Sequence, residues 1–518
     1  MDKITRRQFL RAAGGVTFLA LVPTGKGLFA ASTAGASVPL FIVPPYIQPG
    51  PASKLVDGGD TLVVAWQTED SPAEFTAEYG LSKSYGQTAS IVRGERAIGG
   101  GGGKGKKAIP PIADNSIESR RINYHAVLTG LSLGKTYHYR VKGNGQTIAE
   151  GYAATRKPRG QKIRFVTFGD NSYGDISDRA IAYYAYQARP DFVMNTGDNV
   201  YESGLDNEYA RYFFPAYNAD LASPHDGAPL LRSVPFYTVI ANHDVNGKSD
   251  MGSVANFDTA RDSLGLFTAM HLPLNGPANL SQPPPVVASN TDILDQFKAC
   301  AGDRFPRMAN YSFDYGDAHF LCLDSNDYVD PTDSALQAWI ESDLAGTDAV
   351  WKFVVYHHPA FNVGNEHYRE QHMRVLSPLF EKHSVDMCFH GHEHTYQRTQ
   401  PLRFAPKDST NASAANGKDR RVPGDFTIDT KFDGEKVTKP DGILYITTGA
   451  GGKELYEPAY TDNPSAWLHE DDNNVAYCAK FYSRLHSLTV IDLDSHTLTL
   501  TQINELGQPI DRIRVTKA

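Results

Sequence analysis

The sequence predicts a fold in two parts, an all-β sandwich followed by a larger α/β unit. A chain of 518 residues is longer than one compact core usually supports. Residues 40–157 contain short runs in which apolar and polar side chains alternate, which is typical of half-buried strands. From residue 160 onward, apolar runs are separated by a segment of helical periodicity, which indicates β-α-β units.

The first part is expected to be a sandwich of short strands. Residues 61–67 form one strand, with Trp66 placed to pack inward, and residues 125–131 form another. A turn around Gly134 leads to Tyr137 at the start of a third strand, residues 136–141. This order resembles the tyrosine corner of fibronectin type III and immunoglobulin-like sandwiches. The glycine run 99–103 is expected to be a surface loop, because no phosphate-binding motif follows it.

The second part is expected to extend over residues 160–518. Residues 162–168, 176–187 and 191–195 read as strand, helix and strand, which is one β-α-β unit. The residues from 202 to 233 and from 246 to 308 are expected to be long loops over the site. Further strands are expected at 236–240, 320–323, 352–356, 386–389 and 443–447, helices at 334–344 and 370–383, a loop at 408–434 and a closing hairpin at 488–501.

The N-terminus is expected to be removed from the mature protein. Arg6 and Arg7 precede an apolar stretch, residues 12–22, that is too short to span a bilayer. Small residues then lead to a plausible cleavage site at 34–36. Residues 1–36 therefore resemble a twin-arginine signal peptide and predict a periplasmic or secreted protein. A basic amphipathic helix or an uncleaved anchor is the alternative.

Composition restricts the partners of this chain. Its formal net charge of −9 gives no overall attraction to nucleic acid or to anionic membranes. No apolar segment after the signal is long enough for a membrane helix, so no membrane-spanning segment is expected in the mature protein. The four cysteines show no CxxC spacing, which disfavours a zinc-thiolate site, and both disulfides and buried free thiols remain open.

Five short blocks rich in His, Asp and Asn carry the chemistry. Each block follows or ends an apolar, β-branched run, so each is expected at the carboxyl end of a strand, where loops of α/β sheets converge on one crevice. Any one block could be an ordinary turn, but five in order point to a common site. The blocks are Gly169-Asp170-Asn171-Ser172, Gly197-Asp198-Asn199-Val200-Tyr201, Ala241-Asn242-His243-Asp244, Val354-Val355-Tyr356-His357 and Gly391-His392-Glu393-His394.

The donor types in these blocks favour hard or borderline metals. They are carboxylates, imidazoles, an amide and a phenol, without a thiolate, which suits Fe, Mn or Zn. The blocks supply enough donors for two ions, and hydrolysis of phosphate esters heads the reactions of two-metal sites.

The blocks resemble those of the metallophosphoesterase (calcineurin-like) superfamily. The Tyr of Gly-Asp-x-x-Tyr and a fibronectin-like N-terminal domain are similar to the purple acid phosphatases. The resemblance implies an α/β metallophosphoesterase β-sandwich flanked by helices, with Fe(III) in one metal position and a divalent Fe, Zn or Mn in the other. It implies that Asp170, Tyr201 and His394 bind one metal, that Asn242, His357 and His392 bind the second, and that Asp198 bridges them.

The resemblance also implies two groups outside the metal shell. His243 and His367 would hold the substrate phosphate and protonate the leaving group, because imidazole titrates near working pH. Ser172 and Ala241 stand where the family usually has Gly, and both are small enough to keep the ligand geometry. Glu366 stands where plant members often carry a His, and a carboxylate there would repel a phosphate dianion.

The expected function is an exported acid phosphatase that hydrolyses phosphate monoesters by attack of a metal-activated hydroxide. One alternative is a phosphodiesterase acting on nucleotide or phospholipid diesters, with a pocket shaped by the two long loops. A second alternative is a surface-binding protein whose metals are structural.

Overall fold

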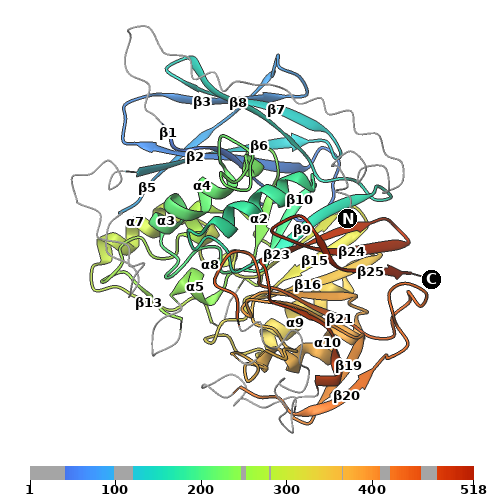
Figure 1. The fold of residues 1–518 in the computed structure, drawn as a ribbon. Coiled ribbons are helices and arrows are strands. Elements are labelled where there is room, and N and C mark those ends of the chain that lie inside the picture. The colour runs from blue at the N-terminus through green and yellow to red at the C-terminus, as the bar shows by residue number, and fades with distance from the viewer. Residues whose placement is uncertain are drawn as a thin grey trace, which may run out of the picture. The chain divides into compact units, whose positions relative to one another are not determined.

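The structure is a computed structural model that describes residues 41–97, 121–246, 253–278, 282–364, 366–408, 420–456 and 475–517 (Figure 1). Residues from Val38 onward form one compact unit. The predicted signal peptide and the glycine run 99–103 lie outside the described residues. Among the helices that are described, none is long and apolar enough to cross a membrane.

The N-terminal part consists of two four-stranded antiparallel sheets, ordered β1-β2-β6-β5 and β4-β3-β7-β8. The strands predicted at 61–67, 125–131 and 136–141 are β2, β6 and β7. Trp66 is buried and stacks on Tyr124, which places it in the core between these sheets. The strands are β1 (Phe41–Gln48), β2 (Asp60–Glu69), β3 (Phe75–Gly80), β4 (Gln87–Ala89), β5 (Ile91–Glu95), β6 (Arg121–Leu131), β7 (Thr136–Gly143) and β8 (Gln146–Ala154).

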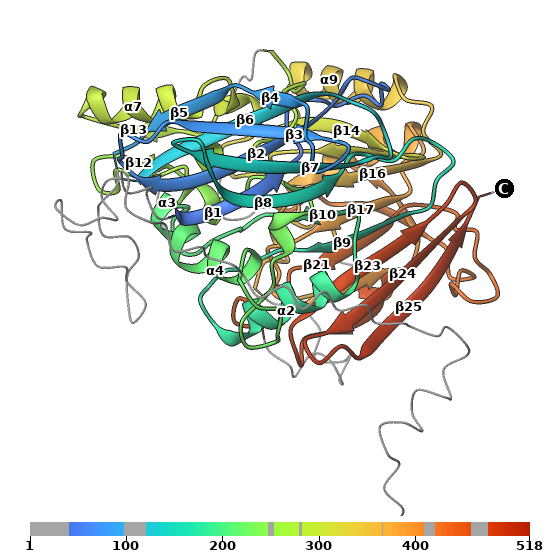
Figure 2. The ribbon, with the colours of Figure 1, turned by 90° about the horizontal axis from the view of Figure 1, so that it is seen from above.

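Two larger sheets form the rest of the core. Figure 2 shows β24 and β25, a hairpin at one edge of the six-stranded sheet. The six-stranded sheet has the order β11-β10-β9-β23-β24-β25 and the seven-stranded sheet the order β14-β15-β16-β17-β21-β18-β22. Phe165 of the first sheet packs edge-on against Phe353 and Phe389 of the second. This aromatic contact belongs to the largest apolar cluster of the protein.

Most strands of these sheets were predicted within a few residues. The short pair β12 (Ala255–Asn256) and β13 (Val286–Val287) and the hairpin of β19 (Leu402–Pro406) and β20 (Gly424–Ile428) lie outside them. The strands are β9 (Ile163–Phe168), β10 (Phe192–Asn195), β11 (Phe236–Thr238), β14 (Tyr311–Tyr315), β15 (Ala318–Cys322), β16 (Trp351–Val355), β17 (Met387–His390), β18 (Tyr396–Thr399), β21 (Leu444–Thr448), β22 (Cys478–Tyr482), β23 (Ser487–Leu493), β24 (Thr497–Asn504) and β25 (Pro509–Thr516).

Parallel pairing sets the direction of the strands that lead to the site. β9, β10 and β11 are parallel neighbours in one sheet, and β15, β16, β17 and β21 are parallel neighbours in the other. The crossover from β9 to β10 is the helix α2, as predicted. The helices are α2 (Ile176–Gln187), α3 (Asp206–Glu208), α4 (Phe214–Tyr217), α5 (Asn242–Val245), α6 (Leu266–Ala269), α7 (Thr291–Ala301), α8 (Arg304–Arg307), α9 (Ser334–Ala345) and α10 (Ser377–Lys382), with further turns η2 (Tyr209–Phe213), η3 (Leu230–Arg232), η4 (His372–Leu376) and η8 (Val475–Tyr477).

The prediction that 246–308 is only an irregular loop was wrong, because this segment contains α7. Asn290 caps the helix by accepting a hydrogen bond from the backbone N–H of Asp292. Phe297, Cys300 and Ala301 are its buried residues, at the i, i+3, i+4 spacing of one helix face. Residues 202–233 likewise contain α3, η2, α4 and η3.

Two further predictions were wrong in part. The helix expected at 370–383 is the 3₁₀ turn η4 followed by α10, because Pro378 lacks an N–H and fits only the first turn of a helix. The loop expected at 408–434 contains the strand β20, which pairs with β19, while residues 409–419 lie outside the described part. All four cysteines are described and none is paired with another.

A buried histidine connects helix α9 to the seven-stranded sheet. His319 on β15 lies 2.7 Å from Asp314 through Nδ1 and 2.7 Å from Asp343 of α9 through Nε2. Burial alone would lower the pKa of His319, but the two carboxylates outweigh burial and raise the pKa above its usual value. The folded state therefore favours the imidazolium form.

Replacing His319 with Gln is expected to destabilise the protein by about 3 kcal/mol at pH 6, because one buried and one largely buried carboxylate lose their cation. The loss of free energy of unfolding should be complete below about pH 6.5, the pKa of histidine in the unfolded chain. It should shrink as pH rises through the raised pKa of His319 in the folded protein. Urea unfolding at pH 6 and pH 9 measures it, with the exposed His496→Gln as control. A difference that grows with pH would contradict this assignment.

Candidate metal centre

Every candidate ligand lies just beyond the carboxyl end of a strand. Asp170 follows β9, and Asp198 and Tyr201 follow β10. Asn242 begins α5, four residues after β11 ends. The remaining three, His357, His392 and His394, follow β16 and β17 of the other sheet. The structure therefore brings all seven predicted ligands to the place where the parallel edges of the two sheets meet.

Three of these residues adopt left-handed backbone conformations. The φ angles are 58° at Asp170, 51° at Asp198 and 67° at His392. Such angles are uncommon outside glycine and cluster at functional sites, where surrounding contacts hold them. Here the backbone N–H of His392 donates to both carboxylate oxygens of Asp170 at 2.9 Å, which joins the two sheets. The turns thus aim the side chains at one point at a local cost in backbone energy.

Gly391 allows the two sheets to approach closely. A Cβ atom at this position would lie 2.5 Å from Oδ2 of Asp170 and 3.0 Å from Nδ1 of His357. Both neighbours are candidate ligands held in place, so a larger residue would displace one of them. Position 391 therefore requires glycine, because there is no room for a side chain.

The first predicted ligand group is assembled around a phenol. The Tyr201 hydroxyl lies 3.0 Å from Asp198 Oδ2, 3.2 Å from Asp170 Oδ1 and 3.3 Å from His394 Nε2. His394 Nε2 is also 3.6 Å from Asp170 Oδ1. Four donor groups from three strand ends thus converge within a few ångströms.

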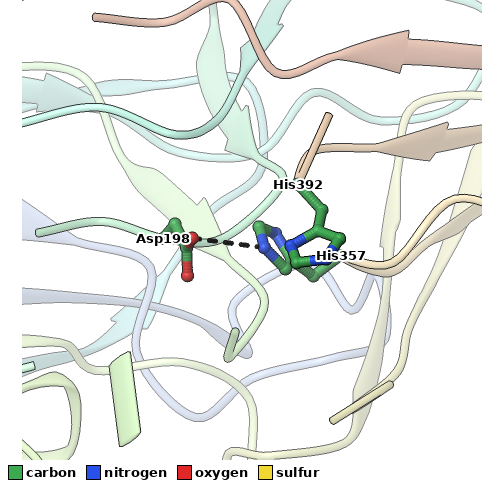
Figure 3. A group of neighbouring side chains, drawn as sticks. All are labelled: Asp198, His357 and His392. Atoms are coloured by element: carbon green, nitrogen blue, oxygen red, sulfur yellow. Dashed lines mark ion pairs between the residues drawn. The ribbon is translucent and has the colours of Figure 1, made fainter. Parts of the chain in front are cut away.

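The second predicted group also adjoins Asp198. Asp198, His357 and His392 form a set whose donor atoms all lie within 4.8 Å of one another and could hold a metal ion (Figure 3). His357 Nε2 is 3.3 Å from Asp198 Oδ2. Asn242 Oδ1 and His357 Nε2 are buried without a hydrogen-bond partner. Buried polar atoms rarely stay unsatisfied, so these two fit a site for a cation.

Hydrogen bonds determine which nitrogen each histidine presents. His357 donates from Nδ1 to the carbonyl of Thr196 at 2.8 Å, and His394 donates from Nδ1 to the carbonyl of Glu454 at 2.7 Å. Both rings therefore direct Nε2 toward the carboxylates. His392 makes its contact through Nε2, to Glu370 at 3.0 Å, which leaves Nδ1 for the centre. A metal ligand needs one free lone pair and an acceptor for its other N–H, and all three rings meet this requirement.

Without a cation, protons balance the buried charges. Burial would lower the pKa of His357, but Asp198 and Asp170 raise it to about 9. Burial raises the pKa of Asp170 well above its usual range, and burial next to both carboxylates likewise raises the pKa of Tyr201. A metal would have to displace these protons, as is usual for metal sites.

The similarities to known proteins agree with this geometry. Residues 163–396 match the calcineurin-like phosphoesterase family. The chain carries a calcineurin-like metallophosphoesterase domain. All seven predicted ligands lie within the matched range. The similarity to the purple acid phosphatases is also confirmed by sequence relatives and by a solved structure.

The relatives of this chain are distant. Purple acid phosphatase 23 of Arabidopsis thaliana is 30% identical over 161 residues, which is 30% of this chain and 28% of that relative. Phosphoenolpyruvate phosphatase of Allium cepa is 23% identical over 418 residues, 76% of this chain and 68% of that relative. The purple acid phosphatase PPD1 from yellow lupin (Lupinus luteus) seeds superimposes with a TM-score of 0.60 at 16% identity, covering 91% of this chain and 74% of that chain, which shows a common fold.

A cavity of about 470 Å³ opens onto the candidate metal centre. Both predicted outer groups, His243 and His367, line it together with Asp198 and Asn242. His243 donates from Nδ1 to the carbonyl of Glu202 at 2.8 Å, so its Nε2 is the nitrogen left for a ligand. The ring of His367 packs against that of His392 at a tilt of 37°, with centroids 3.9 Å apart. The structure thus brings both groups to the centre.

Sequence reasoning missed several residues of the site. Glu370 contacts two of the histidines, and Lys453 and Tyr456 line the cavity. None of the three stands in a ligand block. Glu370 falls where a helix was expected, although its place three residues after His367 was a usable signal. Lys453 lies 3.4 Å from Glu202 and above the ring of Tyr173.

Asp244 is a buried acceptor that joins two of the ligand blocks. Its carboxylate accepts hydrogen bonds from the backbone N–H groups of Asp198, Asn199 and Ala241 and from the hydroxyl of Tyr209. Burial, and then the charge of Asp198, raise the pKa of Asp244 to about 7. Its block was noted in the sequence, but this positioning role was not.

Replacing Asp244 with Ala is expected to lower the free energy of unfolding by about 3 kcal/mol, because several buried donors lose their acceptor. The isosteric Asp244→Asn keeps one acceptor oxygen and should lose about 1 kcal/mol. Urea midpoints of both variants and the wild type measure this effect. Equal midpoints for the three proteins would show that other groups hold the two blocks together.

Proposed function

We propose that this metallophosphoesterase is an exported acid phosphatase that hydrolyses phosphate monoesters at a centre of two metal ions. The observation that carries the proposal is the convergence of five strand ends on one buried point, with three imidazoles whose hydrogen bonds leave one free nitrogen each. Such preorganised donors are what a metal site needs and what an ordinary set of turns does not supply.

The two ions are assigned to the two donor groups described above. Asp170, Tyr201 and His394 would hold Fe(III), since a phenolate is a hard anionic donor. The second group, Asn242, His357 and His392, would hold a divalent Fe, Zn or Mn, with Asp198 between the ions. When bound, the ions supply Lewis-acid stabilisation of the phosphate charge and an activated water at neutral pH.

Two side chains that line the cavity have roles in the proposed reaction, one in binding the phosphate and one in protonating the leaving group. His243, fixed through its Nδ1, offers Nε2 to a phosphate oxygen. His367 lies with Nε2 3.0 Å from the Tyr456 hydroxyl and is the candidate proton donor to the departing alcohol. Burial would lower the pKa of His367, but Glu370 outweighs burial and the pKa is raised, which favours the protonated form that an acid requires.

For the organisation of the whole chain we propose the three parts that the sequence predicts. Residues 1–36 would be a twin-arginine signal that sends the protein to the periplasm or the exterior, supported by Arg6 and Arg7 before an apolar stretch. Residues 40–157 would be a fibronectin III-like domain, supported by the two sheets and by the Tyr137 hydroxyl, which accepts from the N–H of Ser132. Residues 160–518 would be the catalytic domain.

Loading the purified protein with iron and zinc is expected to give two bound ions and a purple colour from phenolate-to-Fe(III) charge transfer. Tyr201→Phe should abolish the visible band and lower kcat/KM about 100-fold, because a charged donor is lost at the reacting centre. Metal analysis and the visible spectrum measure both effects.

The matched control for this experiment is Tyr173→Phe. Tyr173 packs against Tyr201, with ring centroids 5.9 Å apart, but is not a candidate ligand. The Tyr173→Phe variant should keep the purple colour. A colourless wild type that holds only zinc or manganese would remove the Fe(III)–phenolate assignment, and removal of all metal without loss of activity would remove the two-metal proposal.

Phosphodiester hydrolysis is the second candidate, and the carboxylates of the cavity favour it. Glu202, Glu366 and Glu454 line the same cavity as the candidate ligands. A monoester dianion is repelled by these groups more strongly than a diester monoanion is. The relative rates of monoester and diester hydrolysis show whether the metals outweigh this repulsion.

Glu366→Gln is expected to raise kcat/KM for an aryl phosphate monoester by about threefold, because an exposed like charge is removed from the entrance. The corresponding aryl diester, with one charge fewer, should gain less. Steady-state rates of the wild type with both esters test the proposal directly. A wild type that turns over the diester faster than the monoester would establish the second candidate instead.

A further inference from the structure

One carboxylate connects the metal centre to the candidate acid. Glu370 accepts a hydrogen bond through Oε1 from Nδ1 of His367 and another through Oε2 from Nε2 of His392, both at 3.0 Å. The two rings pack against each other, with centroids 3.9 Å apart and an angle of 37° between their planes. A ligand of the second metal and the proton donor thus share one partner.

Glu370 accepts the outward ring N–H of His392, as backbone carbonyls do for the other two candidate ligand histidines. His357 and His394 direct Nδ1–H to the carbonyls of Thr196 and Glu454 and are thereby oriented. Among the described residues no backbone carbonyl accepts from the ring of His392, and its outward N–H is held by the carboxylate of Glu370. An anionic acceptor also makes the opposite nitrogen more basic, which strengthens a metal bond.

The backbone around Glu370 is fixed. Its N–H donates to the carbonyl of His367 at 3.0 Å, which closes a tight turn. The next residue, Gln371, is buried, donates from its side chain to the carbonyl of Tyr368 and accepts from Arg374. The carboxylate is therefore presented from an anchored turn and not from a free loop end.

We propose that Glu370 is a positioning residue that holds Nδ1 of His392 toward the second metal and Nε2 of His367 toward the leaving group. This inference rests on the proposed function for its second half only. One carboxylate serves both rings because each oxygen accepts one N–H, which an amide cannot do with its single oxygen.

A direct metal-binding role is the competing assignment. The donor atoms of His358, Glu370 and His392 also lie within 4.8 Å of one another. However, His358 Nε2 is 4.0 Å from Glu370 Oε2, and its Nδ1 is 2.9 Å from the Ser325 hydroxyl. Both oxygens of Glu370 already accept from imidazoles at 3.0 Å, which is the pattern of an outer carboxylate.

The first test measures metal binding and does not depend on activity. Zn(II) is titrated calorimetrically into the metal-free full chain, as wild type and as Glu370→Gln. The variant is expected to bind one of two zinc equivalents at least about tenfold more weakly, while the other equivalent is unchanged. Glu341→Gln is the matched control, since Glu341 is a carboxylate 3.9 Å from His383 on an outer helix.

The second test uses the leaving group. Glu370→Gln is expected to lower kcat about tenfold for an alkyl phosphate and less than twofold for 4-nitrophenyl phosphate, because only the basic alkoxide needs a proton. In a His367→Ala background the same substitution should add no further leaving-group dependence, whereas the loss of zinc affinity should persist.

The outcomes separate the inference from the proposed function. A wild type that hydrolyses no phosphate ester removes the proposed function, and the zinc titration then decides the role of Glu370 alone. Unchanged zinc affinity in Glu370→Gln overturns the inference. A third zinc equivalent that is present in the wild type and absent from the variant also overturns it, because Glu370 would then be a ligand.

Discussion

The burial of Asp170 and Asp198 beside each other is the constraint on which the rest of the centre depends. Two carboxylates withdrawn from water repel each other, and neither is stable there without cations or N–H donors. The two carboxylates are stabilised by imidazoles, by the Tyr201 hydroxyl and by the backbone N–H groups of His243 and His392. The carboxylates therefore explain why the edges of two separate sheets have to meet at this point.

The same requirement extends outward in a second layer. Left-handed turns at Asp170, Asp198 and His392 are unfavourable in isolation, and they persist only where neighbouring contacts over-determine them. Asp244 supplies such contacts on one side, and the carboxylate of Glu370 supplies them on the other. In physical terms, the site is an anionic centre surrounded by histidines, each oriented by an acceptor behind it. This arrangement fits the chemistry proposed for it, in which charge on phosphate is stabilised by groups already in place.

Local patterns were sufficient for most of the fold and for the ligand blocks. Strands such as β9 and β16 are mainly apolar runs that polar residues follow within two positions, and both signals are read from adjacent positions. Predictions failed where distant contacts decide the conformation. β20 forms because β19 pairs with it, and η4 interrupts the expected helix before Pro378. Glu370 was missed for a related reason, since its spacing from His367 is a local signal but its second partner, His392, is brought beside it only by the fold.

The sequence by itself determined the donor types, their order along the chain and their placement at strand ends, because these depend on residue chemistry and on short-range periodicity. It also carried the resemblance that the family match confirms. Only the tertiary structure decided which ring nitrogen of each histidine faces the centre, which buried atoms lack a partner and which carboxylates lie behind the ligands. These properties arise from hydrogen bonds between segments as far apart as Asp170 and His392, 222 positions along the chain, and no local pattern encodes them.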